Sequence, residues 1–231
     1  MRRRLTLAAA ALALAGAIAA PEGLAGRECE GLDACIRVVG PWVQVPAGEA
    51  PTYYQLRCPG RGQLVGGLDA DLGGRMEITF LGVLGGPVSP GVTTGSSIVF
   101  VARSATQGAQ TFRPLLGCIP ASGGGRARTS YEPTRTLEQA RPPAEPTIRR
   151  VTTVRLRRSP STLTRSCRAG ERLLAFSHAL AFRTRTPPAE SLLTGLRATS
   201  HRSGHRVVVS LRGTLLPEAR VELQIHVVCA L

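Results

Sequence analysis

Lysine and asparagine are absent from the sequence. All 29 basic side chains are therefore arginine, and the chain has no Asn-x-Ser/Thr site for N-glycosylation. Both missing residues have A/T-rich codons, so a GC-rich genome explains their absence without selection for function. The result is that all positive side chains are guanidinium groups, which bind phosphate and carboxylate groups through two parallel hydrogen bonds.

Aromatic side chains are also scarce, at 4% of the residues, with one tryptophan and three tyrosines. So few rings exclude a platform that stacks the bases of single-stranded nucleic acid. A carbohydrate-binding site that stacks aromatic rings on a sugar would have to use Trp42 together with an outward Tyr53 or Tyr54. A G-x-S-x-G nucleophile elbow and a C-x-x-C pair are absent too.

The histidines do not assemble a catalytic or metal site by sequence spacing. Ser177 and His178 are neighbours on a predicted strand, so they point to opposite faces and form no local dyad. His201 and His205 flank the turn sequence Arg-Ser-Gly, so their spacing does not place them on one helix face. His226 lies on the polar side of its predicted strand, where we expect it to be solvated or at a sheet edge.

Two carboxylates form the other candidate site. Asp69 and Asp71 alternate with apolar residues and so share one strand face, where they could serve acid–base chemistry or bind calcium. The spacing of further oxygen ligands that calcium needs is missing around them, so we expect an ordinary solvent face or loop, with no metal and no cofactor. The enzymatic alternative is an extracellular hydrolase whose site lies between two domains, with a carboxylate near a histidine in a shared cleft.

The first nineteen residues have the three parts of a secretory signal peptide. Residues 1–4 are positive, residues 5–18 are apolar, and small residues occupy positions 17 and 19. The apolar run is shorter than the roughly twenty residues that a spanning helix needs. We therefore expect cleavage, secretion to an extracytoplasmic location, and no transmembrane segment in the mature protein.

A short sequence recurs in the chain. Residues 58–67 (CPGRGQLVGG) align with residues 167–176 (CRAGERLLAF) as a cysteine, a Gly-containing turn, a polar residue and two aliphatic residues. A second cysteine follows at a similar distance in each copy, at Cys118 and Cys229. Several landmarks in the same order indicate a tandem duplication.

Gly- and Pro-rich residues 120–146 separate the two copies. We therefore predict a first domain at 27–119, a linker at 120–146 and a second domain at 147–231. Apolar and polar residues alternate in each copy, and Gly or Pro follows every eight to twelve residues. These features predict an all-β protein of two small antiparallel β-sandwich or barrel domains.

The six cysteines are even in number, which in an exported chain indicates disulfides. If the copies share a fold, their common cysteines pair within each copy, and the two additional cysteines of the first copy pair locally. The predicted disulfides are Cys29–Cys35, Cys58–Cys118 and Cys167–Cys229.

The pattern C-P-x-G-x-x-L-x-G-G at residues 58–67 resembles uncharacterised secreted proteins of GC-rich bacteria with tandem β modules. The second copy departs from it at the final glycines, which are Ala175 and Phe176. The resemblance implies export and tandem β modules, and it implies no activity and no site residues.

Positive charge is concentrated in the second copy. Residues 20–119 carry seven arginines and eight acids, whereas residues 147–231 carry fifteen arginines and four glutamates, a net charge of +11. A genomic bias would act on both copies alike, so it does not explain this difference. The densest stretch supplies the candidate anion-binding residues Arg149, Arg150, Arg155, Arg157 and Arg158.

We therefore expect a secreted, non-enzymatic binding or structural protein whose second domain contacts an anionic partner electrostatically. Candidate partners outside a cell are an anionic cell-wall polymer, a lipid head group or nucleic acid. The other non-enzymatic alternative is a protein-interaction or inhibitor module, which would expose a large apolar patch.

The signal peptide gives a first testable prediction. When the full-length chain is expressed in a bacterium that exports it, the mature protein is expected to begin at Ala20. N-terminal sequencing of the protein from the extracytoplasmic fraction checks this. An uncleaved chain found only in the cytoplasm would contradict it.

Overall fold

The computed structural model describes residues 26–230, apart from residues 31, 33, 49, 85–94, 105, 121–133, 136, 142–146 and 216–219. Within the described residues the chain is almost entirely antiparallel β-structure, which confirms the predicted all-β class. The predicted signal peptide at residues 1–19 lies outside them.

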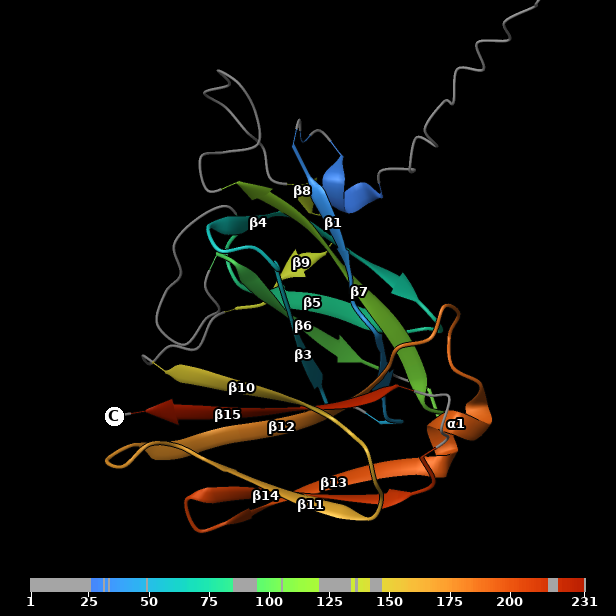
Figure 1. Cartoon of the computed structure of the whole chain (residues 1–231), viewed down its shortest axis with the longest axis vertical. Helices are drawn as coiled ribbons and strands as arrows, with labels where there is room; N and C mark the ends of the chain where they lie inside the picture. The colour runs from blue at the N-terminus through green and yellow to red at the C-terminus, as the bar shows by residue number, and fades with distance from the viewer. Residues whose placement is uncertain are drawn as a thin grey trace, which may run out of the picture.

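The first half of the chain forms two sheets that enclose an apolar core (Figure 1). The strands of one sheet are β1 (Ile36–Val39), β2 (Trp42–Val45), β4 (Gln63–Leu72) and β7 (Gln110–Pro120); those of the other are β3 (Thr52–Arg57), β5 (Glu77–Leu81) and β6 (Ser97–Arg103). A short 3-10 helix, η1 (Arg27–Cys29), precedes them. Phe80, Phe100 and Phe112 fill the space between the sheets, so the few phenylalanines of the chain serve packing.

The second half repeats this arrangement with smaller apolar side chains. One sheet consists of β10 (Ile148–Arg155), β12 (Arg172–Phe182) and β15 (Val221–Ala230); the other consists of β11 (Ser161–Ser166), β13 (Leu196–Ser203) and β14 (Arg206–Gly213). Leu211, Leu223 and Ile225 are fully buried between them. A one-and-a-half-turn helix that the sequence analysis did not predict, α1 (Glu190–Gly195), connects β12 to β13.

The two halves have the same strand order. With β1 and β2 counted as one interrupted strand, each half has six strands. In one sheet of each half the sixth strand, β7 or β15, lies between the first and the third. In the other sheet the fifth strand, β6 or β14, lies between the second and the fourth. The register agrees as well, because Ile36 lies opposite Cys118 and Ile148 lies opposite Cys229. The internal duplication stays a prediction, and this shared topology is the structural feature that supports it.

The recurring cysteine sequence has a structural explanation. Each copy makes a turn that contains a glycine in the left-handed region, Gly62 at φ 75° and Gly170 at φ 84°, a conformation that side chains with a Cβ rarely adopt. The strand that follows pairs Val65 with Cys118 in one half and Leu173 with Cys229 in the other. The turn of the first half is one residue longer, so the structural alignment differs by one residue from the sequence alignment.

All three predicted disulfides are present: Cys29–Cys35, Cys58–Cys118 and Cys167–Cys229. In each half the long-range disulfide joins the residue after the second strand to the last strand, with a Cα–Cα distance of 5.8 Å in both. Each of these bonds therefore links the two sheets of its own half.

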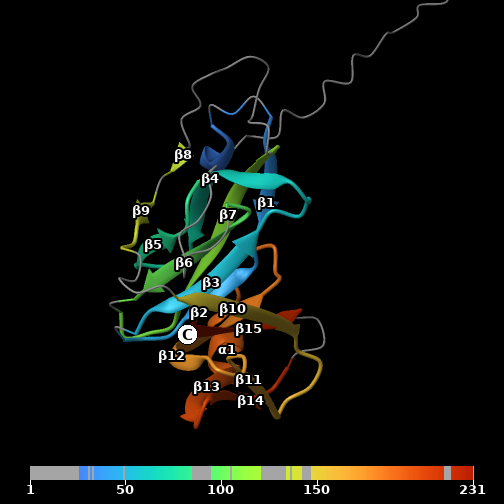
Figure 2. The ribbon, with the colours of Figure 1, turned by 90° about the vertical axis from the view of Figure 1, so that its left-hand side faces the viewer.

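The halves are joined by more than the chain between them. Ala181 and Phe182 of β12 pair with Val43 and Trp42 of β2, so one eight-stranded sheet runs through both halves (Figure 2). Two short strands inside the predicted linker, β8 (Thr134–Arg135) and β9 (Glu138–Gln139), add to the sheets of the first half in parallel orientation. The two halves consequently form one continuous body, and the surface between them is a place where a site could form.

The disulfides give a stability prediction. Replacing Cys167 and Cys229 together by alanine removes a link across 62 residues, which is worth roughly 4 kcal/mol in the chain-entropy account. The Cys29–Cys35 loop spans six residues, and its removal is expected to cost only about 2 kcal/mol. Urea denaturation of the two double variants checks the order; an equal or reversed loss would contradict it.

Candidate functional site

Both faces of β15 are buried, so its polar side chains lie inside the protein. Val221, Leu223 and Ile225 point into the core of the second half. The alternate residues, among them Gln224 and His226, point the other way, where the first half covers them. His226 has none of its surface exposed, so the expectation that it is solvated or at a sheet edge is wrong. The sequence shows the alternation but not the second layer that covers the polar face.

Small side chains on β12 make room for this packing. Ala175, Ser177, Ala179 and Ala181 lie opposite Val228, His226, Gln224 and Glu222 of β15 in the antiparallel register. Ala179 and Ala181 belong to the core of the first half rather than to that of the second. The short side chains let β3 pack closely against this sheet, in the layer arrangement that Figure 1 shows.

Gln224 binds the backbone of the first half like an additional strand residue. Its Nε2 donates to the Gln55 carbonyl at 3.0 Å, and the Gln55 N–H donates to its Oε1 at 2.5 Å. Nε2 also donates to the Thr153 hydroxyl at 3.1 Å. One side chain thus satisfies both main-chain groups of Gln55 on the otherwise unpaired edge of β3.

His226 lies on the same face of β15 as Gln224 and contacts it. Its Nε2 lies 2.7 Å from Gln224 Oε1, which accepts, so Nε2 carries the proton. Nδ1 faces the Arg149 guanidinium at 3.5 Å, and the imidazole ring lies 6.4 Å from the ring of Tyr53. Burial, and secondarily the charge of Arg149, lowers the pKa of His226 to about 3. The imidazole is therefore neutral at physiological pH.

Arg149, one of the predicted anion-binding residues, lies at the junction of the halves. Its guanidinium carbon is 5.1 Å from the centre of the Tyr53 ring, a cation–π contact worth about 0.5–2 kcal/mol. Its Nε is buried and has no hydrogen-bond partner among the described residues, which costs about 1–3 kcal/mol. Burial lowers the pKa of Arg149, yet an arginine keeps its charge in proteins. The described residues therefore leave one hydrogen-bond donor of this cation without an acceptor.

A cleft of about 550 Å³ opens beside Arg149 between the two halves. It is lined from the first half by Tyr53 of β3, Thr79 and Glu77 of β5 and Arg103 of β6, from the segment after β9 by Arg141, and from the second half by Arg149. In the part of the chain that the structure describes, three guanidinium groups from three segments therefore share one cleft with a single carboxylate. Of these three arginines, only Arg149 is predicted from the sequence as an anion-binding residue.

The other four predicted arginines divide into two kinds. Arg150 forms a bidentate ion pair with Glu171, with both distances 2.6 Å, and this contact lowers the pKa of the Glu171 carboxyl. Arg155, Arg157 and Arg158 are exposed, and no carboxylate among the described residues pairs with them. Only these three fit the predicted role of a free electrostatic surface.

A further basic surface covers the outer face of the three-stranded sheet of the second half. Arg197 on β13 lies directly opposite Arg212 on β14, and both are exposed. Like charges at directly opposed positions of a sheet repel each other. The rows beside them carry hydroxyl groups, with Thr162, Ser210 and Thr199 aligned across the three strands. Exposed Arg206 lies on the same face at the other end of β14, so the face is polar and carries positive charge at both ends.

A second cleft of about 560 Å³ lies between the halves near α1, and His178 and Glu190 are among its lining residues. The Ser200 hydroxyl donates to His178 Nδ1 at 2.9 Å, and His178 Nε2 donates to the Ala198 carbonyl at 3.0 Å. Both ring nitrogens are thus engaged, and burial lowers the pKa of His178. Ser177 is not the partner of His178, as the alternation of the strand predicts, and among the described residues no carboxylate accepts a hydrogen bond from this imidazole.

The remaining candidates of the sequence analysis lie elsewhere. His201 and His205 are exposed at the β13–β14 hairpin. Asp71 forms an ion pair with Arg113 at 2.6 Å, and Arg113 lies 4.9 Å from the ring of Trp42, which is buried and thus unsuited to sugar stacking.

One cluster brings metal-ligand side chains together, Cys167, Glu171 and Cys229. Its two sulfur atoms form a disulfide, so they offer no thiolate to a metal ion.

Comparisons with protein-family models, with curated proteins and with solved structures give no match to this chain. No helix in the described part of the chain is long and apolar enough to cross a membrane.

The buried histidines predict a pH-dependent stability. In the unfolded chain His226 takes up a proton near its ordinary pKa of 6.5, whereas in the folded protein it does so only near 3. The contribution is fully present above pH 6.5 and is lost as the pH falls, with a limiting slope of about 1.4 kcal/mol per pH unit. His178 adds to it in the same direction.

Urea denaturation between pH ~7 and ~5 tests this expectation. His226→Gln should retain the hydrogen bonding of the site and show a smaller slope than the wild type, whereas His201→Gln, at an exposed position, should keep the wild-type slope. The same slope for His226→Gln and the wild type would show that burial of His226 does not produce the effect.

Proposed function

We propose that this protein is a secreted, non-enzymatic binding protein whose second half holds an anionic polymer by electrostatic contact. One observation carries the proposal: the positive charge of the second half is exposed and largely uncompensated. Of its four glutamates, Glu171 and Glu222 pair with Arg150 and Arg183. Arg155, Arg157 and Arg158 remain exposed beside them.

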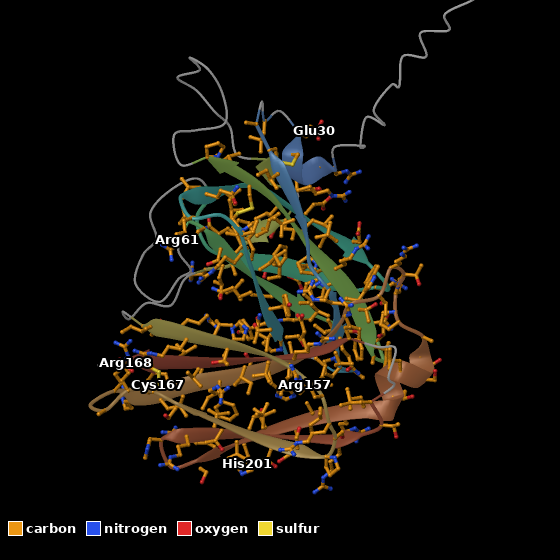
Figure 3. The ribbon with its side chains drawn as sticks, viewed as in Figure 1. Glu30, Arg61, Arg157, Cys167, Arg168 and His201 are labelled. Carbon is orange, nitrogen blue, oxygen red and sulfur yellow. A yellow bond between two sulfur atoms is a disulfide. The ribbon has the colours of Figure 1, made fainter. Side chains whose placement is uncertain are left out.

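The shape of the second half supports a polymer as the partner. Its exposed arginines are spread over several strands and connections rather than gathered in one pocket. Figure 3 shows two of them, Arg157 and Arg168, at separate places on this half. An extended chain of negative groups contacts such a surface at several points. Each contact releases counterions and adds to the affinity.

Secretion is part of the proposal and rests on different observations. Three disulfides close the described part of the chain, and its six cysteines are all paired. Such bonds persist in oxidising compartments outside the cytoplasm. Together with the signal-like first nineteen residues, they support a site of action beyond the cell membrane.

The proposal is tested with dextran sulfate as the anionic polymer and neutral dextran as its control. The wild-type affinity for dextran sulfate should fall steeply with salt. The triple variant Arg155→Ala, Arg157→Ala, Arg158→Ala should bind more weakly and lose roughly one unit of the log affinity–log salt slope for each arginine in contact.

A matched control removes three exposed arginines of the first half, Arg57→Ala, Arg61→Ala and Arg75→Ala. This variant has the same net charge as the test variant but leaves the proposed surface intact, so it should retain nearly wild-type binding. Equal losses in the two triple variants would show that only net charge matters, and salt-insensitive or absent binding would refute the proposal.

A further inference from the structure

We infer that the cleft beside Arg149 is a binding site for a phosphate monoester group, held by guanidinium groups that both halves of the chain supply. The cleft brings Arg103 of β6, Arg141 after β9 and Arg149 of β10 together in a space of about 550 Å³. These residues are 38 and 8 positions apart along the chain, so only the packing of the halves assembles them. This site is separate from the polymer-binding surface and does not depend on it.

The charge of the cleft suits a dianion. Among the described residues, three arginines and one carboxylate, Glu77, give the lining a net charge of +2 at neutral pH. Glu77 lies opposite Arg103 in the antiparallel register of β5 and β6, so it is positioned to offset that arginine alone. A phosphate monoester carries a charge of about −1.5 to −2 at pH 7, whereas a carboxylate carries −1. The phosphate therefore matches the remaining charge better.

The hydrogen-bonding groups of the cleft point to the same ligand. Arg149 has a buried Nε that lacks a partner among the described residues, and no carboxylate among them forms an ion pair with it. The Tyr53 ring holds the guanidinium by its face, and the Thr79 hydroxyl lies in the same lining. The exposed guanidinium groups of Arg103 and Arg141 and the Thr79 hydroxyl can all donate to the three oxygens of one phosphate group in the cleft.

The size of the cleft argues for an ester rather than a free ion. A volume of about 550 Å³ lies in the range of sites for small organic molecules, about 300–1,000 Å³. Inorganic phosphate would fill only a small part of it. Apolar side chains in the lining, Leu81, Val101 and Val228, offer a surface for the organic part of the ligand. We therefore expect glycerol phosphate to bind more tightly than inorganic phosphate.

The experiment is isothermal titration of the full chain at low ionic strength with glycerol phosphate, inorganic phosphate, dimethyl phosphate and acetate. The two dianions should bind, and the monoanions dimethyl phosphate and acetate should bind at least about tenfold more weakly. Tighter binding of inorganic phosphate than of its ester would identify free phosphate as the ligand. Equal binding of all four anions would overturn the site.

Single-residue variants separate this site from the general positive charge of the protein. Arg103 and Arg141 are exposed, so Arg103→Ala and Arg141→Ala should fold normally and each bind glycerol phosphate about tenfold more weakly. Arg61→Ala, an exposed arginine of the first half that lies outside the cleft lining (Figure 3), should bind it like the wild type. If Arg61→Ala loses as much as the cleft variants, the inference is wrong.

A direct readout of Arg149 avoids the risk that its removal unfolds the protein. In the NMR spectrum, the Nε–H signal of Arg149 should shift on addition of glycerol phosphate but not of acetate. Arg149→Lys retains the charge and loses the planar fork, so it should bind more weakly while the dextran sulfate affinity of the chain is unchanged. An Nε–H signal that does not respond to glycerol phosphate would exclude Arg149 from the site. Loss of polymer binding with intact phosphate binding would refute only the proposed function.

Discussion

The burial of β15 on both faces is the constraint on which the rest of the structure depends. One face completes the sandwich of the second half, and the other carries Gln224 and His226 against the first half. A polar side chain is tolerated there because it is hydrogen-bonded: Gln224 satisfies the backbone of Gln55, and His226 in turn donates to Gln224. The small side chains of β12 allow the close approach that makes these bonds possible.

This junction turns two similar sandwiches into one body. The pairing of β2 with β12 extends a single sheet across both halves. Within each half, the long-range disulfide links the two sheets to each other. The two clefts follow from this arrangement, because each is lined by residues that the first half and the second half contribute separately. Arg149 lies on the strand next to the contact, which explains why an arginine from a basic stretch is largely buried.

The arginines of the chain occur in two kinds of structural environment. Some arginines are used within the fold, as in the pair of Arg150 with Glu171 and the contact of Arg113 with Asp71 and Trp42. Others stay on the surface of the second half, where no described carboxylate forms an ion pair with them. Because both kinds occur within one ten-residue stretch, sequence density alone does not separate a structural arginine from one that is available to a ligand.

The sequence by itself determined the β class, the three disulfide pairs and the concentration of charge in one half, because alternation, the spacing of the recurring cysteines and composition can be read along the chain. Only the tertiary structure decided that the two halves share a sheet, that His226 is buried, and that Arg103 and Arg141 meet Arg149. A strand pattern shows which residues share a face, but it does not show whether a second layer covers that face. Contacts between residues far apart in the chain depend on that layer, so they could not be read from the sequence.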